Sequence, residues 1–402
     1  MANKVDQDIM REANRKLIIQ ALFNAEQTSR SEIADQIELH KSTVTTIYRE
    51  IEESGFIEEL GEGTVSKAGG RKPKLIRFNH NLGYIVSFDL GHYHLRYMAA
   101  RITGEIITQG ELTITGMDIA AIQRAMLAYI TQLGTLKTDR GLMGVSVAIH
   151  GVVENNRVHY APYHLDLLSI DLAKQLESQL NVPVYLENEA NLAAVYLRDY
   201  RDYDGGALLH NFITVNIHDG IGAGVILNDR LFPGVHGEAG EIGRMVMSNN
   251  HWQDEGFTGD VHLEDLFSED ALIARLARIK KIDYLTMDEF LSLWDNNDAD
   301  ALHLVDEWIE TLAKAIFNLV QYMAPEAVFV HSRILARHPE FYTRMEARYQ
   351  TIAPHTTIPL KFARRSVDRA TLAGGISYTT RKLLDMIDFT LIFTDNKSKQ
   401  TT

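Results

Sequence analysis

The stretch Phe212–Arg244, FITVNIHDGIGAGVILNDRLFPGVHGEAGEIGR, decides the fold, because a β-rich opening runs into two glycine-rich turns. The glycines form two groups, Gly220, Gly222 and Gly224 and then Gly234, Gly237, Gly240 and Gly243. Glycine lets a backbone approach a ligand closely or adopt a positive φ. Because Glu238 and Glu241 lie between these glycines, the stretch predicts a small-ligand site. Taken alone, it also fits an antiparallel hairpin with a glycine-rich loop.

The composition is that of a soluble globular protein with two or three domains. The chain has 402 residues, of which 45% are hydrophobic and 23% charged. No apolar run approaches the roughly 18 residues of a membrane helix, and the N-terminal residues lack the layout of a signal peptide. We therefore expect a cytoplasmic protein. With no cysteine, disulfides and thiolate metal sites are excluded.

Charge is unevenly distributed along the chain. The formal net charge of −14 argues against a protein that binds nucleic acid over its whole surface. Residues 1–80 carry 12 Lys and Arg against 13 Asp and Glu, whereas the remainder carries 28 against 41. A basic run without acidic residues lies at 67–77. A locally basic end on an acidic body is typical of a DNA-binding head attached to a sensor domain.

Three amphipathic helices are predicted near the N-terminus, at residues 8–25, from Ser29 onward and at 41–54. Ser29 and Glu32 have the spacing of a capping box at the start of the second helix. The third helix buries Val44, Ile47, Tyr48 and Ile51. Its other face presents the candidate DNA contacts Lys41, Ser42, Thr43, Thr45, Thr46 and Arg49. This pattern predicts a helix-turn-helix, with a plain three-helix bundle as the alternative.

A β-hairpin is predicted directly after the third helix. Residues 55–60 begin a strand, 61–70 form a loop, and 71–78 return as a basic strand. Such a wing favours the helix-turn-helix over the plain bundle. Arg71 and Lys72 are the candidate minor-groove contacts, because the negative potential of a narrow groove attracts cationic side chains.

The rest of the chain predicts two α/β halves with a cleft between them. In the first half, strands are expected at 83–92, 94–103, 105–115, 143–150 and 182–187, with helices at 118–133, 170–180 and from Asn188. In the second half, two strands span the central stretch and another lies at 327–331. Helices are expected at 264–278, 301–323 and 370–386, and the tail from Leu391 is expected to be disordered.

Four motifs in this order resemble the ROK proteins (repressors, open reading frames and sugar kinases) in their repressor form. They are FDLG at Phe88–Gly91, ENEAN at Glu187–Asn191, GIGAG at Gly220–Gly224 and GEAGEIG at Gly237–Gly243. The wing and the ENEAN motif look most like the xylose-repressor branch. The resemblance implies a winged helix-turn-helix followed by a two-lobed body of the actin, sugar-kinase and ribonuclease H type.

The resemblance also implies domain boundaries. Residues 1–80 would form the DNA-binding domain, and 81–200 the first lobe, to which the helix at 370–390 returns. Residues 201–369 would form the second lobe, for sugar binding and dimerisation, and 391–402 a disordered tail.

Departures from the kinase pattern predict that the protein is not an enzyme and has no catalytic residues. Where the family's kinases have small residues in the first hairpin, this chain has His92 and Tyr93. Their general base is an aspartate at the position of Glu189, and an extra methylene misplaces the carboxylate by about 1 Å, which can cost about 10²-fold in rate. The glycine pair of their nucleotide pocket appears as His331 and Ser332, although Gly374–Gly375 remains.

The sugar-contacting residues are better preserved. By resemblance, Asn188, Glu189, Glu241 and Glu264 are the predicted sugar-binding residues, and carboxylates and amides suit the vicinal hydroxyls of a pyranose. For Glu264, a solvated residue at a helix start is the alternative. Arg244 replaces the family's zinc-binding histidine, so neither a metal nor a cofactor is predicted. The sequence leaves open whether His150 and His236 line the cleft.

The predicted function is a dimeric, sugar-responsive repressor of carbohydrate-utilisation genes. Its partners would be operator DNA and a monosaccharide effector such as xylose. An active ROK-type sugar kinase and a repressor controlled by a phosphotransferase-system protein are the alternatives. The family usually has serine at the position of His40, which caps a helix poorly, so we expect Ser42 to take over the cap and shift the helix start.

Overall fold

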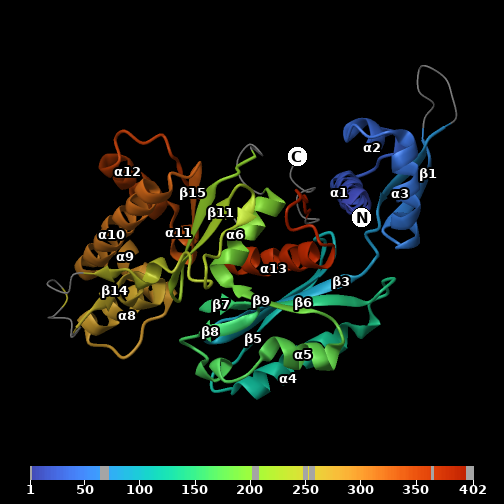
Figure 1. The fold of residues 1–402 in the computed structure, drawn as a ribbon. Helices are drawn as coiled ribbons and strands as arrows, with labels where there is room; N and C mark the ends of the chain where they lie inside the picture. Colours follow the sequence, from blue (N-terminus) through green and yellow to red (C-terminus); the bar gives the residue numbers. More distant parts are fainter. Residues whose placement is uncertain are drawn as a thin grey trace.

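A computed structural model describes residues 2–63, 72–201, 208–247, 252, 259–363 and 366–394. The N-terminal head consists of helices α1 (Ala2–Asn24), α2 (Arg30–Gln36) and α3 (Lys41–Glu53) and strands β1 (Ile57–Glu62) and β2 (Lys74–Phe78). The two strands pair antiparallel directly after α3, which gives a helix-turn-helix with a wing (Figure 1). The loop residues between Gly63 and Lys72, including Arg71, lie outside the described residues.

The first lobe is built on a five-stranded mixed sheet. Its strands are β3 (Tyr84–Leu90), β4 (His94–Arg101), β5 (Ile106–Thr113), β6 (Leu142–Ile149) and β9 (Val184–Asn188), in the order β5-β4-β3-β6-β9. Every residue of β3 is buried, as expected for a central strand. Helices α4 (Ile119–Gln132) and α5 (Leu172–Leu180) cover its outer face (Figure 1).

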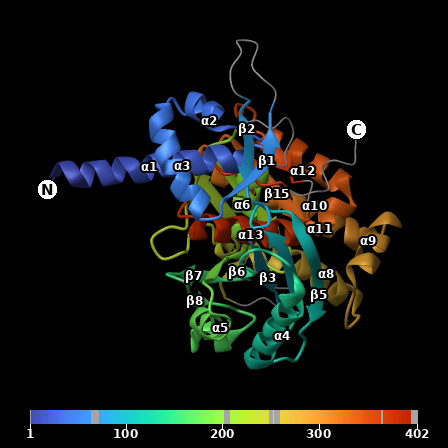
Figure 2. The same ribbon diagram turned by 90° about the vertical axis from the view of Figure 1, so that its right-hand side faces the viewer.

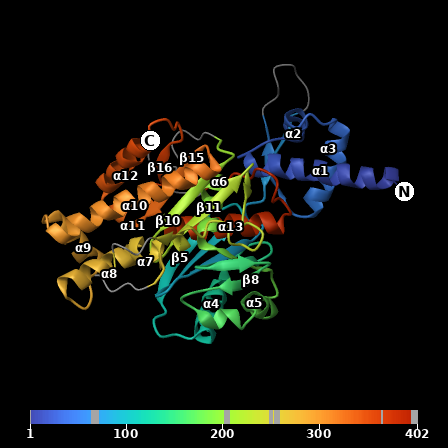
Figure 3. The same cartoon turned by 60° about the vertical axis from the view of Figure 1, so that its left-hand side comes forward.

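The second lobe repeats the same sheet pattern. Strands β10 (Phe212–Ile217), β11 (Ile221–Leu227), β12 (Arg230–Leu231), β15 (Ala327–Ser332) and β16 (Leu360–Phe362) are ordered β12-β11-β10-β15-β16. Around the sheet lie α7 (Leu263–Phe267), α8 (Glu269–Lys280), α9 (Met287–Asp295), α10 (Ala299–Met323), α11 (Arg333–Arg337) and α12 (Pro339–Ile352) (Figure 3). The helix predicted at 264–278 is therefore two helices, because Ser268 caps the second.

Two helices lie between the sheets and join the lobes. These are α6 (Glu189–Tyr200) and α13 (Val367–Leu383), side by side at the centre of the molecule (Figures 1 and 3). Gly374 permits this approach, because a Cβ there would lie 1.9 Å from the Leu192 carbonyl oxygen. On the other side of α6, a Cβ on Gly224 would lie 2.3 Å from the Ala190 carbonyl oxygen.

Small elements complete the body. Short hairpins are formed by β7 (Val152–Glu154) with β8 (Arg157–Tyr160) and by β13 (Val246–Met247) with β14 (Val261–His262). Single 3₁₀ turns lie at Leu133–Thr135, Leu165–Leu168 and Ile242–Arg244. Within the described residues, no helix has the length and apolar character needed to cross a bilayer.

The segment after α13, residues 384–394, ties the head to the body, and we call it the C-terminal strap. Leu391 and Phe393 are each 1% exposed, and the Phe393 ring packs edge-on against Phe23 of α1 at 5.0 Å. Asn24 exchanges hydrogen bonds with the strap backbone, at 2.8 Å to the Thr390 carbonyl and 2.8 Å from the Ile392 amide. The prediction of a disordered tail from Leu391 is therefore wrong for 391–394, whose apolar side chains join the core. Residues 395–402 lie outside the described residues.

The start of α3 also differs from the prediction. The helix begins at Lys41 with His40 as its N-cap, and no side chain caps it. Ser42 does not take over, so the helix start is not shifted. The N-terminal half of α1 extends beyond the rest of the head (Figure 2).

Candidate functional site

The four predicted sugar-binding residues line one cleft between the lobes, which we call the lobe cleft. Its walls come from the turn after β6, the loop after β8, the start of α6 and the glycine turn between β10 and β11. The lining residues are His150, Gly151, Tyr160, Pro162, Tyr163, Asn188, Glu189, Gly220, Ile221, Gly222, Glu241 and Glu264. The deciding stretch Phe212–Arg244 thus contributes both a glycine turn and a carboxylate to a concave surface.

Asn188 mainly holds the start of α6 in place. Its side-chain oxygen accepts hydrogen bonds from the backbone amides of Ala190 and Asn191, at 2.8 and 3.1 Å, and so caps α6. Its amide nitrogen donates to the Gly151 carbonyl at 2.8 Å. Since an asparagine amide offers only two N–H donors and one oxygen, a single N–H is left for a ligand.

Glu241 and Glu264 present carboxylates to the cleft from the second lobe. Glu264 Oε2 accepts a hydrogen bond from the Ile221 amide at 3.3 Å, which fixes the carboxylate beneath the glycine turn. Burial raises the pKa of Glu264. Burial, and then the repulsion of the Glu264 carboxylate, raises the pKa of Glu241 to about 7. Such half-buried acceptors strongly favour a ligand that brings hydroxyl donors.

Glu189 belongs to a network of charged side chains that extends from one lobe to the other. Glu189 Oε2 accepts from the Asn216 amide at 3.0 Å and lies 3.5 Å from His218 Nε2. Burial opposes ionisation of Glu189, but His218, His150 and Asn216 outweigh it and lower the pKa of the carboxyl. Burial likewise opposes the His218 cation, but Glu189 and Asp219 raise the pKa of His218 to about 9.

A further ion pair lies at each end of this network of charged side chains. In the first lobe, His150 Nε2 lies 2.8 Å from Asp89 Oδ1, and Asp89 also lies 3.5 Å from Arg96. In the second lobe, Arg333 binds Asp219 at 2.6 Å and Glu269 at 2.9 Å. His150 lines the lobe cleft, which is one of the two outcomes that the sequence left open. His236 instead pairs with Glu154 at 2.9 Å and does not line the cleft.

Aromatic rings fill the tip of the first hairpin. His92 stacks on Tyr93 with ring centres 3.8 Å apart and on Tyr163 with centres 4.6 Å apart. His164 Nε2 lies 2.8 Å from the Gly91 carbonyl oxygen, which holds the loop after β8 against the hairpin. Bare backbone amides able to cradle a phosphate are therefore not presented at this tip.

The remaining glycine pair of the expected nucleotide pocket has a packing role. A Cβ on Gly375 would lie 2.3 Å from Ser87 Oγ, and Gly374 is pressed against α6 as described above. Ser332 caps α11 and donates its hydroxyl to Glu269 at 2.6 Å. At the position of the family's zinc-binding histidine, the Arg244 guanidinium lies over the Tyr160 ring at 5.3 Å, so that position offers no ligand atom.

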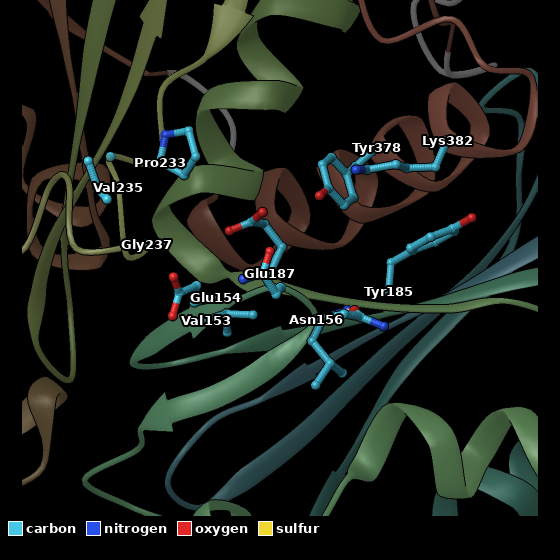
Figure 4. A pocket seen from close by; sticks show the side chains of 13 residues that line it. Val153, Glu154, Asn156, Tyr185, Glu187, Pro233, Val235, Gly237, Tyr378 and Lys382 are labelled. Carbon is cyan, nitrogen blue, oxygen red and sulfur yellow. The ribbon is translucent and has the colours of Figure 1, made fainter.

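A larger pocket lies beside the lobe cleft but contains none of the predicted sugar residues. It is bounded by the β7–β8 hairpin, β9, α13 and the loop after β12 (Figure 4). Glu187, within it, accepts hydrogen bonds from the Asn188 amide at 2.8 Å and from Asn191 at 3.0 Å, and the Tyr378 hydroxyl is a further partner. The Glu187 carboxylate is therefore already satisfied by protein donors.

The predicted DNA contacts on α3 share one accessible face. Lys41, Ser42, Thr46 and Arg49 are exposed, and Thr43 and Thr45 are partly exposed. Thr45 and Thr46 donate their hydroxyls to the Lys41 and Ser42 carbonyls, at 2.7 and 3.1 Å. Lys72 lies 3.8 Å from Glu62 at the wing.

Comparison with known proteins identifies the family. The ROK family matches residues 85–377. The chain belongs to the ROK family. Among ROK proteins, it is 36% identical to a xylose repressor of Lactiplantibacillus pentosus, over 96% of each chain, and 29% identical to one of Staphylococcus xylosus, over 93% of this chain and 96% of that one.

Solved ROK structures share the fold. A ROK family transcriptional regulator, a homologue of the MLC protein of E. coli, superposes with a TM-score of 0.74 at 20% identity and covers 94% of this chain and 98% of its own. A ROK family glucokinase from Streptomyces griseus gives 0.62 at 17% identity and covers 74% of this chain and 99% of its own. The predicted fold class, a winged head on a sugar-kinase-like body, is thus confirmed.

Proposed function

We propose that this ROK protein is a transcriptional repressor that binds operator DNA and responds to a monosaccharide, with xylose as the first candidate. The observation that carries the proposal is its similarity to xylose repressors over almost the whole chain, head included. The protein acts as a regulator and not as a sugar kinase. The ring-filled hairpin at His92 and the packing role of Gly374–Gly375 support this, because phosphoryl transfer needs a phosphate cradle.

Operator recognition is assigned to the exposed face of α3. Short hydroxyl side chains at Ser42, Thr45 and Thr46 let the helix lie deep in a major groove, while Lys41 and Arg49 reach phosphates or guanine edges. Thr43, Arg71 and Lys72 complete the proposed contacts. Since helix-turn-helix dimers bind two half-sites whose symmetry mirrors that of the protein, we further propose a homodimer on a pseudo-palindromic operator.

The effector is assigned to the lobe cleft. Glu189, Glu241 and Glu264 would accept hydrogen bonds from sugar hydroxyls, and Asn188 would donate its remaining N–H. Because the first and second lobes both line the cleft, a bound sugar favours one closure angle over another. A sugar with this differential affinity shifts the population of conformations and thereby the affinity for DNA.

Helix α6 connects the lobe cleft to the head. It begins at Glu189 in the cleft and spans 12 residues, about 18 Å, to Tyr200. The Tyr200 ring lies 5.5 Å from Phe393 of the C-terminal strap, whose ring packs in turn on Phe23 of α1. A tilt of α6 on sugar binding would therefore displace the helix that supports α3.

Fluorescence anisotropy with DNA from upstream of the protein's own gene tests the proposal. Xylose is expected to weaken binding, with glucose and arabinose as comparison sugars. Arg49→Ala is expected to weaken binding with and without sugar and to reduce its salt dependence. Lys174→Ala, which removes an exposed cation on α5 of the body, serves as the control. If no sugar changes DNA binding while a purified phosphotransferase-system protein does, the sugar assignment is wrong. Sugar-dependent ADP release in a coupled assay would instead support the kinase.

A further inference from the structure

His150, Glu189 and His218 meet where the two lobes approach each other. They come from the turn after β6, the first residue of α6 and the end of β10, and one ligand atom from each lies within 4.8 Å of the other two. Glu189 and His218 are buried and His150 nearly so. In the part of the chain that the structure describes, no other group of histidines and carboxylates meets this criterion.

These donors are of the type that binds zinc. Two imidazoles and one carboxylate bind zinc in sites that keep a fourth position open for water or a ligand. His150 and Glu189 also line the lobe cleft, so the open position of such an ion faces the cleft. The absence of a metal was predicted because Arg244 replaces the family's zinc-binding histidine. Arg244 is not one of these three residues, so that prediction concerned a different site.

Each of two donors already has the outer partner that metal ligands need. Asp89 holds one ring nitrogen of His150 at 2.8 Å, and Asn216 holds Glu189 Oε2 at 3.0 Å. A carboxylate behind a histidine and a hydrogen bond to a ligating carboxylate orient the ligands of protein metal sites.

We propose that His150, Glu189 and His218 bind a divalent first-row transition metal ion, preferably zinc, that links the two lobes. Bonds of about 2.0–2.1 Å place neighbouring zinc ligands about 3.3 Å apart. Donor atoms that all lie within 4.8 Å of one another can reach this spacing through small movements of their side chains. The site does not depend on the identity of the sugar, since all three ligands come from the protein.

Metal titration of the untagged, full-length protein tests the site. After dialysis against a chelator and its removal, isothermal titration with ZnCl₂ is expected to show one saturable site per chain, and zinc is expected to raise the melting temperature. His218→Gln and Glu189→Gln should abolish that site. Asp89→Asn, which leaves all three ligands in place, should weaken zinc binding by about 10–100-fold. His236→Gln, which removes an exposed histidine outside the cleft, is the matched control.

Cobalt(II) distinguishes ligation from a purely structural role of these residues. The protein loaded with CoCl₂ should show visible d–d absorption, which His218→Gln should remove while the far-ultraviolet circular dichroism stays unchanged. If the wild type neither retains zinc nor shows cobalt bands, or if His218→Gln binds zinc as tightly as the wild type, the three residues form only a hydrogen-bonded ion cluster. A sugar response that survives in the absence of metal would leave the proposed repressor function intact, so the two proposals can fail separately.

Discussion

At the scale of single residues, Glu241 gives the cleft a pH dependence. Its pKa of about 7 arises from burial and from repulsion by Glu264, with smaller contributions from Glu189 and Glu238, while Arg244 acts in the opposite direction. Because the ionised carboxylate accepts hydrogen bonds more strongly, xylose affinity measured by calorimetry should rise by up to about tenfold from pH 6 to pH 8.

The variant Glu241→Gln separates this effect from other titrations. Its xylose affinity should be lower at pH 8 and nearly independent of pH. The raised pKa also predicts that Glu241 costs the folded state stability as the pH rises from about 4.5 towards 7. The variant should therefore gain stability over the wild type at pH 8, and a steeper loss on raising the pH would contradict the assignment.

Substitution of Asp199 tests the contribution of the buried ion pairs at the end of α6 to stability. It is 0% exposed and binds Arg381 at 2.6 Å and Arg198 at 2.7 Å. Asp199→Asn leaves buried guanidinium groups without their counterion, so chemical denaturation should show a loss of about 3–5 kcal/mol in unfolding free energy. The matched surface change Glu310→Gln, opposite half-exposed Arg348, should cost no more than about 1 kcal/mol.

At this scale the sequence could predict some site residues but not others. Asn188, Glu189 and Glu241 lie in motifs whose order is recognisable, whereas Glu264 was predicted by resemblance outside those motifs. The structure brings all four to one cleft. His218 lies outside these motifs. Its contact with Glu189 depends on β10 packing against the start of α6. Such a tertiary contact cannot be predicted from the spacing of residues along the sequence.

At the scale of secondary-structure elements, the packing of α13 on α6 depends on glycine. Gly374→Ala would place a Cβ 1.9 Å from the Leu192 carbonyl oxygen, and the helices must separate to accept it. We expect a loss of at least about 1–3 kcal/mol in unfolding free energy. Gly134→Ala, with no neighbouring atom within 4 Å, should change stability by less than about 1 kcal/mol in the same experiment.

The elements that sequence could predict are those with strong periodicity. The strands of the first lobe and the long helices at 118–133 and 301–323 were found within a few residues of their observed bounds. The helices α9 and α12 and the hairpin β7–β8 were missed. Ser268 divides one predicted helix, because its side chain caps α8 through the Ala271 amide at 3.2 Å and its extended backbone ends α7.

At the scale of the whole molecule, we expect the C-terminal strap to transmit the effect of sugar binding from the body to the head. Phe393→Leu keeps the side chain apolar but removes the ring contacts with Phe23 and Tyr200. The variant should still bind xylose, while the ratio of operator affinities without and with xylose changes by about 2- to 30-fold. Tyr322→Leu, at a residue that is 88% exposed on α10, is the control and should leave the ratio unchanged.

The strap also restricts how such regulators can be recombined. Since Phe393, Leu391 and the strap backbone complete the hydrophobic core beneath α1, α1 and the C-terminal strap form one physical unit. A chimaera that joins the N-terminal 80 residues of one family member to the body of another would bring a mismatched C-terminus to that core. Biosensors assembled from exchanged heads should therefore work better when both ends of the chain are transplanted together.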